Sequence, residues 1–192
     1  MSFLHSLGEE AALDRLREGA VLVTVNQRLS RFFMHSYALR EQELGRPVFS
    51  TPAIHPYFAW LRILLDAADP TLLPRQWIPL EPVQELTIWE SVIGDSEQAA
   101  NLLRIPPAAQ SAREAWALCC NWRIPWRELE AYEQEDARAF TSWARCFAAE
   151  CEAGSWLDPS RIPDRIVRLL DENRLSPPPE IILCGFDEYT PQ

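Results

Sequence analysis

The chain has 192 residues and a formal net charge of -10, with 47% hydrophobic and 24% charged residues and only 6 glycines. This length and composition suffice for a folded protein with a buried core and exclude wholesale disorder. All 18 basic residues are arginines. By itself the chain therefore lacks the lysine that a working P-loop, a Schiff-base enzyme or a PD-(D/E)xK nuclease core requires.

The negative charge is unevenly distributed along the chain. Residues 1–50 carry six arginines and six acidic residues, so residues 51–192 hold the whole excess of acids, 22 against twelve arginines. Any contact with nucleic acid is therefore expected in the N-terminal part. The sequence has no run of about 18 apolar residues and no apolar signal-peptide region at its start. We expect a cytoplasmic protein without a membrane partner.

The first 70 residues alternate between helix and strand patterns. Residues 7–19 predict a short amphipathic helix, and the apolar run AVLVTV at residues 20–25 predicts a strand buried on both faces. A helix is predicted at residues 27–44, a second strand at residues 47–50 and a further helix around residues 55–67. This order is typical of an open parallel sheet.

The helix predicted after the first strand begins behind Asn26, a good N-cap, and ends at Gly45. Its spacing predicts an inner stripe made of Leu29, Phe32, Phe33 and Tyr37. The opposite side is predicted to carry Arg28, Arg31 and His35.

From residue 71 to about residue 174 only helices are predicted, and seven of the eight tryptophans lie in this stretch. Its predicted core includes Trp116, Phe140, Trp143 and Phe147. A strand pattern returns at residues 180–184, which we expect to be a second interior strand of the parallel sheet. The predicted domains are an α/β core of residues 1–70 plus 175–192 and an inserted helical subdomain of residues 71–174. Because the chain ends soon after this strand, we expect a fragment of a longer protein.

Cysteines and histidines form no recognisable site in the sequence. Cys119, Cys120, Cys146 and Cys151 lack the spacing of zinc ligands and are interpreted as buried thiols. His5, His35 and His55 are far apart and have no paired carboxylate, and no GxSxG motif is present. We therefore predict no catalytic residue, no metal and no cofactor. We interpret Glu133, Glu135 and Asp136 as a solvated helix start, because acidic side chains there interact favourably with the helix dipole.

The turn after the first predicted strand, Thr24 to Arg28, contains neither glycine nor lysine. Two interpretations of this turn remain open. The turn is an ordinary capped helix start, or it is a residual anion site in which Arg28 and bare helix N–H groups meet a phosphate.

The C-terminal stretch IILCGFDEYTPQ, residues 181–192, resembles the Walker-B strand of superfamily-one DNA helicases. It is closer to the corresponding strand of AddB-like and RecC-like subunits of bacterial helicase-nuclease complexes. VLVTVNQRLSRFF at residues 21–33 and FSTPAIHPYFAWL at residues 49–61 resemble the start of predicted DNA-repair proteins, an AddB-like helicase remnant followed by a PD-(D/E)xK nuclease. The resemblance implies an α/β, P-loop-NTPase-like three-layer parallel sheet with degenerate Walker motifs and a large all-helical insertion.

The resemblance also implies that the ATPase site is lost. In the preferred register Cys184 takes the place of the magnesium-binding Asp, and Gly185 that of the catalytic Glu. Neither residue can hold a metal-bound water or act as a base. In the alternative register Asp187 and Glu188 form the acidic pair, but they lie beyond the strand end.

The function implied is an ATPase-inactive helicase-like domain that binds or guides DNA and docks partner domains. The expected partners are weakly bound single-stranded DNA, a nuclease domain in the same full-length chain, which would be an exonuclease, and an AddA-like motor subunit. The candidate DNA contacts are Asn26, Gln27, Arg28, Arg31, Ser50, Thr51 and Pro52. One rival hypothesis is a protein-interaction module whose helical half binds a protein. Another is a nucleotide-binding enzyme with an unusual site.

Overall fold

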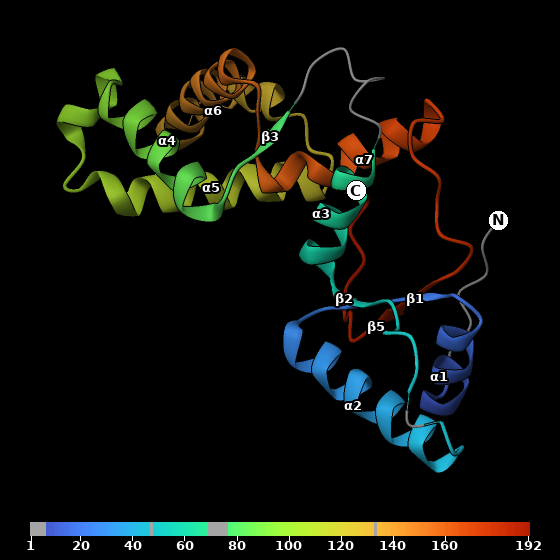
Figure 1. The fold of residues 1–192 in the computed structure, drawn as a ribbon. Helices are drawn as coiled ribbons and strands as arrows, with labels where there is room; N and C mark the ends of the chain where they lie inside the picture. Colours follow the sequence, from blue (N-terminus) through green and yellow to red (C-terminus); the bar gives the residue numbers. More distant parts are fainter. Residues whose placement is uncertain (1–6, 47, 69–76, 133) are drawn as a thin grey trace. The chain divides into compact units, whose positions relative to one another are not determined.

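The computed structural model describes residues 7–46, 48–68, 77–132 and 134–192 (Figure 1). The chain divides into two compact units, each of which is described by itself. The first, here called the α/β unit, comprises residues 1–68 and 169–189. The second, here called the helical unit, comprises residues 69–168 and 190–192.

A three-stranded parallel sheet organises the α/β unit, with strand order β2-β1-β5. The strands are β1 (Val21–Thr24), β2 (Ile54–Pro56) and β5 (Ile181–Cys184). In the central strand, Leu22 lies opposite Ile54 on one side and Ile182 on the other. The prediction of a mixed α/β fold with a parallel sheet is therefore confirmed.

The prediction for the second strand was wrong. Of residues 47–50, Pro47 lies outside the described residues, Val48 is exposed and Ser50 is exposed coil. Phe49 is not in a strand and packs against the core beside Tyr37, with their ring centroids 5.6 Å apart. The strand forms later because Ile54 is the residue that fills the core beside Leu22.

The last strand was predicted to be interior, and this was also wrong. Among the described residues, β5 pairs with β1 on one side only. Ile182 is buried, but Ile181 and Leu183 on the other face are 42% and 41% exposed. A run of apolar residues therefore marks the strand correctly, although only one face of it is buried.

Helices flank the sheet on both faces. Helices α1 (Glu9–Arg17) and α2 (Gln27–Glu43) pack against the face that carries Leu22. A guanidinium nitrogen of Arg17 lies 2.7 Å from the buried carboxylate of Glu41 and ties these two helices together. Helix α3 (Tyr57–Ala67) lies on the opposite side of the sheet (Figure 1).

The inner stripe predicted for α2 is correct except at one position. Phe33 and Tyr37 are buried, and Leu29 packs against the same core. Phe32 is 51% exposed because its position points about 100° away from that of Phe33. Arg28, Arg31 and His35 are exposed, as predicted.

The helical unit is built from α4 (Pro82–Gly94), α5 (Ile105–Asn121) and α6 (Glu135–Gly154), with short 3-10 turns η2 (Glu97–Asn101), η3 (Trp126–Ala131) and η4 (Pro159–Arg161). Its core contains all four predicted aromatic residues: Trp116, Phe140, Trp143 and Phe147. Helix α7 (Ile162–Asp171) begins in this unit, and its residues from Leu169 onward belong to the α/β unit.

The helical unit also contains a small sheet, although only helices were predicted there. β3 (Ile78–Pro79) and β4 (Trp156–Leu157) form a parallel pair. Strands of two residues are too short to show a periodicity in sequence. None of the helices within the described ranges is long and apolar enough to cross a lipid bilayer.

Candidate functional site at the carboxyl edge of the sheet

The turn between β1 and α2 consists of only two residues, Val25 and Asn26. The Asn26 side chain accepts a hydrogen bond from the Leu29 amide at 3.0 Å, and its carbonyl accepts one from the Ser30 amide at 3.3 Å. The prediction that Asn26 caps this helix is therefore confirmed, and the residual anion site stays a prediction. A turn this short cannot form the glycine-rich loop whose amides surround a phosphate in P-loop proteins.

Two buried hydroxyl groups stabilise this turn by hydrogen bonds. Thr24, the last residue of β1, is fully buried, and its Oγ1 lies 2.6 Å from the Ser30 Oγ. The Thr24 hydroxyl also donates to the Asn26 carbonyl at 2.9 Å. Sequence reasoning missed this pair. The signal for it is a threonine at the end of an otherwise apolar run.

Gly185, directly after β5, is required by local packing. Its φ is +80°, and a Cβ added there would lie 2.6 Å from Leu29 Cδ2 and 3.1 Å from Val25 Cγ1. The Val25 amide donates to the Cys184 carbonyl at 3.1 Å, which holds the two strand ends together. Cys184 is half-buried against the core, and burial raises the pKa of its thiol.

Gly185→Ala is expected to lower the free energy of unfolding of the α/β unit by about 1–3 kcal/mol, from backbone strain and the collision with Leu29 and Val25. Gly45→Ala is the matched control. Gly45 has a φ of +73° but no heavy atom within 4 Å of an added Cβ. It therefore measures the strain alone. Hydrogen exchange of the β1 and β5 amides would report both effects, and equal losses would show that the packing account of Gly185 is wrong.

An array of aromatic rings runs along the same edge. The ring centroids of Phe58 and Tyr57 are 5.4 Å apart, those of Tyr57 and Phe186 6.0 Å, and those of Phe186 and Tyr189 6.4 Å. The two outer rings, Phe58 and Tyr189, are 64% and 57% exposed. This row combines residues that follow β2 with residues that follow β5. Sequence reasoning missed it, although aromatic residues directly after both strands were a visible signal.

Partial burial shifts the titration of two residues at this edge. Desolvation lowers the pKa of His55 in β2 and raises the pKa of the Tyr57 phenol. Both groups are therefore held in their neutral forms near pH 7. Asp187 and Glu188 are exposed beyond the end of β5.

The candidate DNA contacts fall into two places. Arg28 and Arg31 are exposed on the first turns of α2, beside Asn26 and Gln27 at the carboxyl edge. Ser50, Thr51 and Pro52 come before β2, whose direction is the same as that of β1. They therefore lie toward the amino edge of the sheet, and the structure does not bring the two groups together.

The cysteines outside this edge lie in the helical unit. Burial raises the pKa of the Cys120 and Cys151 thiols to about 12, and it also raises the pKa of the Cys119 thiol. The buried-thiol interpretation was wrong for Cys146, which is exposed. In the described ranges, no three histidine, cysteine or acidic side chains lie close enough together to hold a metal ion.

The acidic helix start has a simple structural description. Glu135 and Asp136 are exposed in the first turn of α6, in agreement with their interpretation as a solvated helix start. Glu133 lies outside the described residues.

No protein-family model and no curated protein matches this chain. The resemblance to AddB-like and RecC-like proteins consequently remains a prediction. The α/β class and the three-stranded parallel sheet are established by the structure itself.

Proposed function

We propose that this chain is a helicase-like domain that no longer hydrolyses ATP and that binds single-stranded DNA at the carboxyl edge of its sheet. It would belong to a DNA-repair helicase-nuclease protein with a P-loop-NTPase-like core. A nuclease domain elsewhere in the full-length chain and an AddA-like motor subunit are its proposed partners.

The absence of ATP hydrolysis is supported by the turn and by the end of β5. Open α/β sheets bind their ligands at the carboxyl ends of the strands. In this sheet these include the ends of β1 and β5. At this place the chain offers a two-residue turn without lysine and, after β5, Cys184 and Gly185 in place of acids. It therefore has no group in these positions to clamp phosphates or to hold magnesium.

The single observation that carries the DNA proposal is the aromatic row beside the exposed start of α2. Proteins bind single strands by stacking bases on aromatic rings and by placing arginines on phosphates. Phe58 and Tyr189 expose their rings, and Arg28 and Arg31 are exposed on the helix that follows β1. Asp187 and Glu188 in the same segment repel phosphates, so we expect weak binding.

Arg28→Gln combined with Arg31→Gln is expected to weaken binding of a fluorescein-labelled oligothymidine about tenfold at low salt. If each arginine contacts one phosphate, the slope of log affinity against log salt falls in magnitude by about 1.4. Fluorescence anisotropy at several salt concentrations measures both quantities. The control is Arg104→Gln with Arg138→Gln, which removes the same charge from exposed positions of the helical unit.

A second variant tests the stacking. Tyr189→Ala should weaken binding by about 1–3 kcal/mol if a base rests on this ring, with the salt slope unchanged. Equal losses in the arginine pair and its control would contradict the proposed face. No binding by the parent chain at any salt concentration would favour the rival hypothesis, a protein-interaction module.

A further inference from the structure

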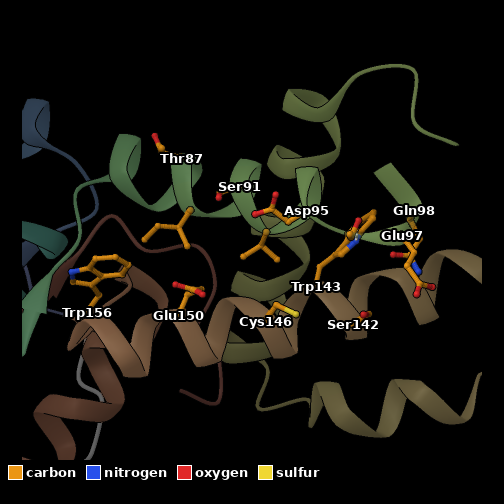
Figure 2. A pocket seen from close by; sticks show the side chains of 13 residues that line it. Thr87, Ser91, Asp95, Glu97, Gln98, Ser142, Trp143, Cys146, Glu150 and Trp156 are labelled. Carbon is orange, nitrogen blue, oxygen red and sulfur yellow. Dashed lines mark hydrogen bonds between the residues drawn. The ribbon is translucent and has the colours of Figure 1, made fainter. Parts of the chain in front are cut away.

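A cavity of about 600 Å³ opens between α4 and α6 within the helical unit. Figure 2 shows the side chains of the two helices facing each other across it. From α4 and the residue after it, the lining includes Thr87, Ser91 and Asp95, which are spaced four residues apart. The lining from α6 includes Cys146 and Glu150, with the same spacing. A volume of this size is within the range of small-ligand and peptide side-chain sites.

The charge of the cavity is entirely negative. Asp95, Glu97 and Glu150 line it, and no arginine or histidine is among its lining residues in the described ranges. None of these three carboxylates forms an ion pair with another residue of the described chain. The cavity therefore repels phosphate and favours a cationic ligand. The carboxylates do not converge on a metal site, so an organic cation fits better.

Two indole rings stand toward the ends of the cavity. Trp156 lies near Glu150, and Trp143 lies nearer Glu97 (Figure 2). The Trp143 Nε1 donates to the Ser96 Oγ at 3.1 Å, which fixes the ring. A Cβ added to Gly154 would lie 2.5 Å from the Trp156 ring, so this ring packs tightly over the end of α6.

Fixed indoles beside unpaired carboxylates match the chemistry of arginine. A guanidinium stacks on the face of a tryptophan and also pairs with a carboxylate through a planar fork of N–H groups. One end of the cavity provides the partly buried Trp156 ring with Glu150, and the other provides Asp95 and Glu97 beside the largely buried Trp143. Along α6, Ser142 and Glu150 are about 12 Å apart, a distance that an extended peptide covers in about four residues.

We propose that this cavity binds an extended, arginine-bearing segment of a partner protein. One guanidinium lies between Trp156 and Glu150, and a second pairs with Asp95 and Glu97 beside Trp143, which is only 9% exposed. Charge complementarity extends beyond the cavity, because the helical unit has sixteen acidic residues and ten arginines. The inference does not depend on DNA binding, which is proposed for the other unit.

Isothermal titration calorimetry with a blocked Arg-Ala-Ala-Ala-Arg peptide tests the proposal, because residues i and i+4 of an extended chain point to the same face. Glu97→Gln combined with Glu150→Gln is expected to weaken binding at least about tenfold at low salt. The matched control is Glu128→Gln with Glu135→Gln, which removes the same charge from exposed positions outside the cavity. The control should change the affinity by about twofold or less. A blocked Gln-Ala-Ala-Ala-Gln peptide should give no measurable binding.

Alkylation of Cys146 locates the binding place. This exposed thiol lies in the cavity, so the arginine peptide should slow its reaction with iodoacetamide, followed by mass spectrometry. Equal weakening in the two double variants would overturn the proposal, because it would indicate general attraction to a negative surface. So would equal binding of the glutamine peptide, an unchanged alkylation rate at saturating peptide, or no binding by the parent protein.

Discussion

Phe147→Ala is expected to lower the free energy of unfolding of the helical unit by about 3–5 kcal/mol. Phe147 is fully buried in α6, and its ring stacks on Trp89 with centroids 4.0 Å apart. The Trp116 ring is inclined at 72° to the Phe147 ring, with their centroids 5.5 Å apart. Removing this ring leaves a void between two large indoles that cannot collapse into it, so both the transfer free energy and the ring contacts are lost.

Urea unfolding followed by tryptophan fluorescence measures this effect. Only Trp60 lies in the α/β unit, so the fluorescence reports mainly on the helical unit. Leu118→Ala is the control within the same unit, because Leu118 is 55% exposed on α5, and it should cost about 0.5 kcal/mol or less apart from helix propensity. A loss below about 1 kcal/mol for Phe147→Ala would contradict the packing described for this core.

Glu85→Gln is expected to remove most of the pH dependence of the helical unit's stability between about pH 5 and about pH 8. Glu85 is buried on α4, and one of its carboxylate oxygens, Oε1, has no hydrogen-bond partner in the described chain. Burial, with a smaller contribution from the Asp158 carboxylate, raises its pKa from 4.5 to about 7. The guanidinium groups of Arg113 and Arg161 oppose this shift.

The direction of the effect follows from proton uptake. Between pH 4.5 and about 7 the folded protein keeps the Glu85 proton and the unfolded chain releases it. The stability from this proton is therefore fully present below pH 4.5 and is lost as the pH rises through about 7. The loss is on the order of 2–3 kcal/mol. A neutral glutamine carries no such proton, so its contribution is the same at both ends of the range.

Urea titrations at about pH 5 and about pH 8 give the change in the free energy of unfolding between these pH values, for the parent and for Glu85→Gln. Other titrating groups cancel in this comparison because both proteins share them. Glu90→Gln, on the same helix but partly exposed, should keep the parental pH dependence. A parental free energy of unfolding that rises with pH would contradict a buried, neutral Glu85 carboxyl. The same pH dependence in Glu85→Gln as in the parent would contradict it too.

The elements that depend on local pattern were predicted well. A run of β-branched residues marks β1 to within one residue of each end, and helical spacing marks α2 and the helical stretch that contains α5 and α6. β2 was misplaced because its three residues, Ile54–Pro56, include a histidine and a proline and show no strand pattern. Its position is determined by pairing with β1, which is a tertiary contact and not a local preference.

The site could be predicted only in part for the same reason. The Asn26 cap is local, and it was recognised from residue type alone. The aromatic row requires Tyr57 to meet Phe186, residues that approach each other only after the sheet has formed. The cavity of the helical unit likewise depends on how α4 and α6 pack. The sequence reveals the tryptophans and the acids there, but it does not reveal the hollow between them.

The register of the sheet has a consequence for how the chain folds. Leu22 pairs with Ile182, about 160 residues further along the chain, so the sheet closes a very long loop. On the ribosome residues 69–168 of the helical unit are synthesised before β5 emerges. During this interval one edge of β1 lacks its neighbour and is open to pairing with other chains. Folding of the helical unit is therefore expected to come first, and completion of the sheet to be the slow step.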